Sequence, residues 1–162
     1  MDLGYPDEQE LTPEAVPYQN CALKQDLARL QSAWSRCRST RERSAIYKFL
    51  GAVFSLVDVW GAAQQEQRCA SLALRLTGLD ELPREEPYGA VLRCITDIDR
   101  KTKSKWSRVL RYAHEHKLRS ESIQKFVTSR GGINKCAEKY ARRLGRHRPR
   151  PRMQLGAEKR RT

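Results

Sequence analysis

The most apolar stretch of the chain, residues 44–61, reads SAIYKFLGAVFSLVDVWG. Its apolar side chains recur at helical spacing, so one side of a helix here can be buried along its length. The residues expected on that side are Tyr47, Leu50, Val53, Phe54, Val57 and Trp60. Ser44 precedes them at a position suited to a helix N-cap. We therefore expect a central core helix that ends near Gly61.

Amphipathic patterns on both sides of this stretch predict further helices. They cover about residues 20–38, 64–76, 87–97, 102–116, 120–129 and 133–144. The residues expected inside are Cys69, Leu72, Ala73 and Leu76 for the third helix, and Ile133, Cys136, Ala137, Tyr140 and Leu144 for the seventh. No alternating strand pattern and no Asn-Gly or Asp-Gly hairpin turn competes. The sequence predicts an all-α fold, a single bundle of about six to seven helices.

The helical domain is expected to span residues 20–144, with a polar segment at each end. Residues 1–19 carry five acidic residues, three prolines and no basic residue, which predicts a disordered acidic arm. Residues 145–162 are rich in Arg and Pro and lack helical periodicity, which predicts a disordered tail. Within the domain, residues 20–99 form a near-neutral body and residues 100–144 a basic helical part.

The net charge of +13 is unevenly distributed along the chain. Residues 1–100 hold 12 Lys/Arg and 15 Asp/Glu, whereas residues 101–162 hold 20 Lys/Arg and 4 Asp/Glu. A near-neutral half joined to a strongly basic half indicates a body with a contact surface for a polyanion. The alternative is a solvated basic surface that only keeps the chain in solution.

The sequence favours a cytoplasmic protein that does not enter a membrane. No run of about 18 uncharged apolar residues occurs. The first residues, MDLG, lack the basic and then apolar layout of a signal peptide. The five cysteines include no Cys-x-x-Cys pair, which excludes a zinc ribbon and a thioredoxin-like motif. Those inside helical stretches are expected to be buried, reduced thiols: Cys37, Cys69, Cys94 and Cys136.

The sequence predicts no catalytic residue, metal site or cofactor. His114-Glu115-His116 does not match His-Glu-x-x-His, and histidines two residues apart on a helix point in different directions. A Gly-x-Ser-x-Gly elbow and a phosphate-cradling glycine loop are both missing. We therefore do not expect an enzyme.

Cationic residues follow one face of the helix expected over residues 102–116. Lys101, Lys105, Arg108 and Arg111 recur at spacings of four, three and three, with Lys103 nearby. Another face is apolar and is expected to attach the helix to the core, through Trp106, Val109, Leu110 and Ala113. Thr102 and Ser104 are candidate caps, whose hydroxyl and free backbone N–H groups are able to meet a phosphate. The pattern predicts a nucleic-acid contact face, and a solvated basic face is the alternative.

Two short predicted helices flank Gly131-Gly132, which indicates a helix-turn-helix-like pair. The run GGINKCA, residues 131–137, resembles the turn and helix of Fis-type DNA-binding regions. The second helix adds four candidate nucleic-acid contacts, namely Lys135, Lys139, Arg142 and Arg143. The tail adds four more, which alternate with proline in an extended chain, namely Arg146, Arg148, Arg150 and Arg152. The tail is similar to an AT-hook but lacks its Arg-Gly-Arg-Pro centre, so phosphate contact is the prediction.

Three stretches together carry a resemblance to a family: RSAIYKFLGAVF at 43–54, KSKWSRVLRYA at 103–113, and GGINKCA at 131–137 with the ending Leu144-Gly145-Arg146. They resemble a group of small proteins of rhizobia-like alphaproteobacteria, often encoded on plasmids or mobile elements. The resemblance covers about residues 20–146 and implies a bacterial, cytoplasmic setting. It implies no activity, because none is established for the group.

The charge asymmetry and the cationic helix predict a nucleic-acid-binding accessory or regulatory protein, with DNA favoured over RNA. A plasmid, phage or mobile element is the expected setting. The alternative is a non-enzymatic interaction module whose basic half docks an acidic protein partner. The oligomeric state and any sequence preference are not predicted.

Overall fold

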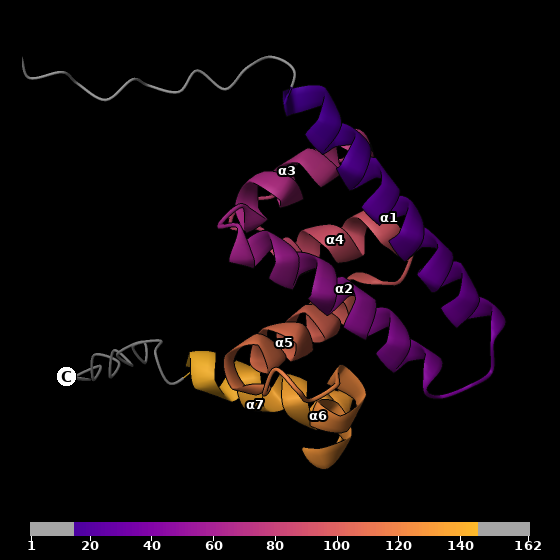
Figure 1. Cartoon of the computed structure of the whole chain (residues 1–162). Coiled ribbons are helices and arrows are strands. Elements are labelled where there is room, and N and C mark those ends of the chain that lie inside the picture. Colours follow the sequence, from indigo (N-terminus) through magenta and orange to yellow (C-terminus); the bar gives the residue numbers. More distant parts are fainter. Residues whose placement is uncertain (1–14, 146–162) are drawn as a thin grey trace, which may run out of the picture.

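The structure, a computed structural model, describes the backbone of residues 15–145 and the side chains of residues 21–145. This part of the chain forms seven α-helices and no strand (Figure 1). The helices are α1 (Ala15–Ser39), α2 (Ala45–Ala62), α3 (Glu66–Leu76), α4 (Pro87–Ile95), α5 (Arg100–His116), α6 (Ile123–Ser129) and α7 (Ile133–Gly145). The predicted all-α bundle of six to seven helices is confirmed.

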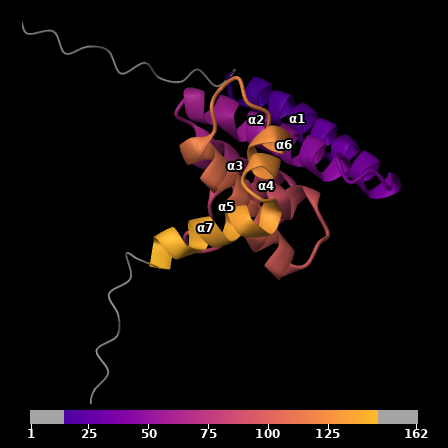
Figure 2. The same ribbon diagram turned by 90° about the horizontal axis from the view of Figure 1, so that it is seen from below.

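The helices fall into two groups that share one core. In Figure 1, α1 and α2 form a long helical hairpin against which α3 and α4 pack. The basic helices α5, α6 and α7 lie together at the other end of the molecule (Figures 1 and 2). There α5 contacts α4 and α7, and α6 contacts α2. The cluster of buried apolar side chains draws on all seven helices, so the near-neutral body and the basic part are packed as one unit.

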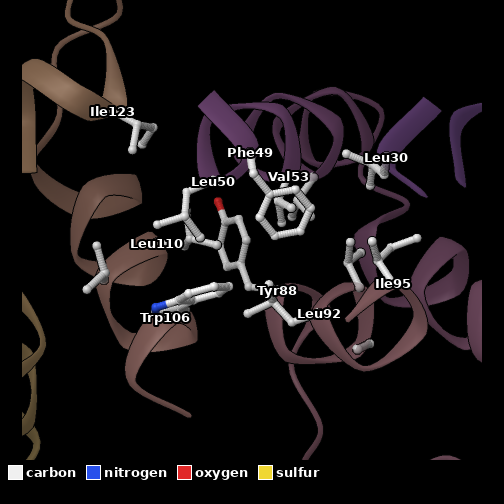
Figure 3. Close-up of a cluster of buried hydrophobic side chains, with 14 of the residues drawn as sticks. Leu30, Phe49, Leu50, Val53, Tyr88, Leu92, Ile95, Trp106, Leu110 and Ile123 are labelled. Carbon is white, nitrogen blue, oxygen red and sulfur yellow. The ribbon is translucent and has the colours of Figure 1, made fainter. Parts of the chain in front are cut away.

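The centre of the core is aromatic and lies between α1, α2 and α5. Phe49 is 1% exposed, and its ring centroid lies 5.0 Å from that of Trp34 and 6.2 Å from that of Trp106. Figure 3 shows Phe49 and Val53 of α2 in the same cluster of buried side chains as Tyr88 of α4. The tilted pairs that Phe49 forms with the two tryptophans add to the free energy gained by burial alone.

The helix α2 has the central place predicted for it, with a shifted inner face. Leu50, Val53, Val57 and Trp60 are buried as expected. Tyr47 and Phe54 are only half-buried, and Phe49 is buried in their place. By length and composition alone α2 also meets the criteria for a helix that crosses a membrane. In this structure its inner face packs into the core, as the central helix of a helical bundle does.

Three helix starts differ from the sequence-based expectation. α1 begins at Ala15 rather than near residue 20. Pro17 is compatible with this earlier start, since it falls in the first turn, where a missing N–H breaks no intrahelical hydrogen bond. Residues 15–19 of the expected acidic arm are therefore helical, and residues 1–14 lie outside the described residues. Ser44 precedes α2, but its hydroxyl makes no capping bond and instead lies 3.5 Å from Glu42 Oε2. At α5 the cap is Asp99 rather than Thr102 or Ser104.

The structure also differs from the prediction in the inner faces of α3 and α7 and in the burial of the cysteines. α3 buries Ala70, Ala73 and Leu74, while Cys69, Leu72 and Leu76 are half-buried around them. On α7, Cys136, Ala137 and Tyr140 are buried as predicted, but Ile133 is half-buried and Leu144 is 49% exposed. Among the cysteines only Cys136 is buried, where desolvation raises the pKa of its thiol. Cys37, Cys69 and Cys94 are half-buried, and all are free thiols.

The Asp99 cap predicts a pH dependence of stability. The Thr102 hydroxyl donates to Asp99 Oδ1 at 2.5 Å and the Thr102 N–H donates to Oδ2 at 3.2 Å, and these bonds lower the carboxyl pKa below its ordinary value of 3.8. A group with a lowered pKa in the folded state stabilises it above the unfolded pKa and loses that effect as pH falls through the folded pKa. We expect Asp99→Asn, which keeps a capping side chain, to be less stable than the parent at pH 7, and the difference to shrink only as the pH falls below 3.8 and through the lowered pKa of the folded carboxyl. Urea unfolding at pH 7 and at about pH 2 measures this, and an equal difference at both would contradict it.

Candidate nucleic-acid interface

The helix α5 is attached to the core by the face that its sequence predicts. Trp106, Val109, Leu110 and Ala113 are all buried. Lys101 and Lys105 are exposed on the solvent side, and Lys103 is half-buried. The N-terminal N–H of Thr102 is occupied by Asp99, so this donor is not free to meet a phosphate as the sequence suggested.

The four cations expected on one face of α5 are divided between two places. Arg108 and Arg111 line a groove between helices, whereas Lys101 and Lys105 do not. Each residue of an α-helix turns the side-chain direction by about 100°, so Lys105 and Arg111 point about 120° apart. Their spacing keeps them away from the buried face, but it does not place them side by side.

The groove has a volume of about 310 Å³ and lies between α4, α5 and α7. The side chains that α5 contributes are Arg100, Lys103, Ser104, Ser107, Arg108 and Arg111. From α4 come Gly89 and Arg93, from α7 come Tyr140 and Leu144, and from the residues just before α4 come Glu85 and Glu86. Arg100, Ser104 and Ser107 were not named as contacts from the sequence. These three residues are spaced by four and then three, and Ser104 and Ser107 each lie four residues before Arg108 and Arg111. This helical spacing in the sequence could have identified them as neighbours of the two arginines.

Arg93 and Arg111 are held in place at the groove by carboxylates. Arg93 Nη1 lies 2.7 Å from both carboxylate oxygens of Glu85, whose side chain is only 6% exposed. Arg111 forms an ion pair with Glu86, and its guanidinium carbon lies 5.0 Å from the ring centroid of Tyr140. Hydrogen bonding to a carboxylate and stacking on an aromatic ring together fix the plane of a guanidinium group.

The α6–α7 pair has the order and turn of the expected helix-turn-helix-like segment. Ser122 caps α6 by accepting the Lys125 N–H at 3.1 Å. The turn requires glycine, because Gly131 and Gly132 have φ values of +95° and +97°. A Cβ on Gly131 would also lie 2.5 Å from the Lys135 side chain. The two helices are held by different neighbours, since α7 packs mainly against α5 and α6 mainly against α2.

The outward side of α7 is cationic only in part. Lys135 and Lys139 are exposed. Arg142 is exposed too, but its Nη2 lies 2.5 Å from Glu138 Oε1, one turn before it. Arg143 forms an ion pair with Glu115 near the end of α5, and its Nη1 lies 3.0 Å from His116 Nε2. The four tail residues Arg146, Arg148, Arg150 and Arg152 lie outside the described residues.

Most cations of the basic part are not neutralised by the fold. Residues 100–145 hold fourteen Lys/Arg and three Asp/Glu. Each of these carboxylates is in an ion pair, namely Glu115–Arg143, Glu121–Arg130 and Glu138–Arg142. Arg111 is paired with Glu86, so ten cationic side chains of this part have no carboxylate partner within residues 21–145. Adjacent helices thus present a concentrated positive charge to solvent.

Comparisons with family models, with curated proteins and with solved structures find no match to this chain.

The histidines of α5 have structural contacts. His114 Nδ1 lies 3.5 Å from the Tyr88 hydroxyl, and the His116 ring lies 4.6 Å from that of Tyr112. Within residues 21–145 no three His, Cys, Asp or Glu side chains are grouped so that they could hold a metal ion.

Proposed function

We propose that this protein is a non-enzymatic, nucleic-acid-binding accessory or regulatory protein of the cytoplasm, and that its basic helices α5 and α7 contact the phosphates. The observation that supports this is the group of ten cations in residues 100–145 without a carboxylate partner among the described residues. Protein cations that neutralise phosphates release condensed counterions, and this release drives binding. The exposed residues Lys101, Lys105, Lys135 and Lys139 are the proposed contacts on the solvent side.

The net charge of this chain is larger than a folded domain needs for solubility. A net charge of about 2–8 is sufficient for a small domain, and this chain carries +13. The near-neutral body has no comparable surplus, because residues 21–99 hold eleven Lys/Arg and ten Asp/Glu. Among the described residues, the surplus lies in residues 100–145, with fourteen Lys/Arg against three Asp/Glu, and these residues form the helices at one end of the molecule (Figure 1). Residues 146–162 add seven Lys/Arg and one Glu. This uneven distribution favours a contact surface over a general solubility device.

The test is a mobility-shift titration of the full chain with duplex DNA, single-stranded DNA and RNA. If six cations contact duplex phosphates, log affinity against log salt has a slope of about −5, which is about a thousandfold loss between 50 and 200 mM salt. Failure to shift any of the three at about 50 mM salt would overturn the proposal. A protein partner recovered in stoichiometric amount from nuclease-treated lysate, without any shift, would instead support the interaction module.

A further inference from the structure

The groove between α4, α5 and α7 has the chemistry of a phosphate site at its α5 wall. Arg100, Lys103 and Arg108 have no carboxylate partner within residues 21–145. Ser104 and Ser107 lie on the same wall, and their hydroxyl groups take part in none of the side-chain hydrogen bonds of the described residues. Cationic and hydroxyl donors that converge in one recess are typical of phosphate recognition.

Two turns beyond Ser104 along α5, the groove has a flat cationic group in a fixed position. Arg111 lies with one side over the Tyr140 ring and is paired with Glu86, yet its side chain is still 35% exposed. Tyr140 itself is 2% exposed and is therefore covered. Nucleic-acid bases stack on guanidinium planes as they do on aromatic rings. A guanidinium that is already held loses little conformational freedom when a base covers it.

The groove also has an exposed apolar side chain. Leu144, in the last turn of α7, lines the groove and is 49% exposed, although the helical pattern predicted it to be buried. Apolar side chains and guanidinium groups together match the face of a base, which is apolar and polarisable. The rise of α5 separates Ser104 from Arg111 by about 10 Å along the helix. A phosphate near Ser104 and a base near Arg111 would therefore occupy separate parts of the groove.

We propose that this groove holds one unpaired nucleotide of a bound strand, with its phosphate at Arg100, Lys103 and Ser104 and its base against Arg111 and Leu144. The inference rests on the proposed function. A recess of about 310 Å³ is within the range of small-ligand pockets and is too small for a duplex. In a duplex the base faces are covered by neighbouring pairs, so only an unpaired base can enter. The protein therefore binds single strands, or strand ends, more tightly than an intact duplex of equal length.

The experiment measures fluorescence anisotropy of the full chain with a labelled thymine 20-mer and with a mixed-sequence 20-base-pair duplex. Because one stacked base contributes measurably to affinity, we expect the single strand to bind about tenfold more tightly at equal salt. Arg111→Lys keeps the positive charge but removes the planar guanidinium group. Leu144→Ser removes the proposed apolar contact with the base. Each is expected to reduce the single-strand preference to about threefold or less.

The matched control is Leu118→Ser, since Leu118 is 68% exposed and does not line the groove. It is expected to keep the parent's preference, and circular dichroism confirms that all three variants are folded. Equal affinity of the parent for both forms, or an unchanged preference in both groove variants, overturns the groove assignment and leaves duplex binding as the function. The absence of binding to either form at about 50 mM salt overturns the proposed function as well. Displacement of dye-labelled AMP without any strand binding would reassign the groove to a free nucleotide.

Discussion

Replacing Lys101, Lys105, Lys135 and Lys139 together by alanine is expected to weaken duplex binding about a thousandfold at 0.1 M salt. All four side chains are exposed on α5 and α7, and none has a carboxylate partner within residues 21–145. Each lost phosphate contact reduces the slope of log affinity against log salt by about 0.9, so four flatten it by about 3.6. A salt titration of anisotropy, beside the parent, measures both quantities.

The control removes the same charge from the near-neutral body. Its four substitutions to alanine are at exposed cations without a carboxylate partner among the described residues, namely Lys24, Arg36, Arg41 and Arg75. The slope is expected to change by less than about 1, because these side chains contact no phosphate. If the control loses as much affinity as the α5–α7 variant, net charge alone drives binding and the proposed surface is wrong. Two double variants to alanine, Lys101 with Lys105 on α5 and Lys135 with Lys139 on α7, show which helix contributes. Each is expected to flatten the slope by about 1.8.

Replacing Trp106 by alanine is expected to lower the free energy of unfolding by about 3–5 kcal/mol. Trp106 is 6% exposed and lies against Trp34 and Phe49, with ring centroids 6.0 and 6.2 Å away. Its removal leaves a cavity where α1, α2 and α5 meet, and neighbouring side chains only partly fill such a space. A typical domain is stable by only about 5–15 kcal/mol, so much of the folded population could be lost. Urea unfolding followed by circular dichroism measures the change.

Two further substitutions make the Trp106 result interpretable. Trp106→Phe keeps an aromatic ring and is expected to destabilise less, which gives a measurable folded variant if the alanine variant fails to fold. Val59→Ala, at a side chain that is 65% exposed, is expected to change stability by no more than about 0.5 kcal/mol. A loss below about 1 kcal/mol for Trp106→Ala would show that the aromatic cluster is not central to the core.

The burial pattern of α5 could be predicted residue by residue, and the nucleic-acid surface could not. In α5 the apolar residues form a single narrow stripe, so their spacing alone identifies the buried face. In α3 the residues 69–74 are all apolar or small, so the sequence allowed more than one inner face. Packing against α1, α2 and α4 decided which of them are buried. Which cations are available for binding depends on partners distant in sequence. Arg111 and Glu86 are 25 positions apart, and Arg143 and Glu115 are 28 apart.

The sequence by itself determined the all-α class, the order of the helices and the concentration of positive charge in residues 100–145. These properties follow from local periodicity, from glycine at turns such as Gly131-Gly132, and from composition. Only the tertiary structure decided that Arg111 is held by Glu86 and Tyr140, that Leu144 is exposed, and that α4, α5 and α7 enclose a groove. Helical spacing gives the direction of a side chain from its own axis. What that side chain meets depends on how separate helices dock, which is set by the packing of the whole core.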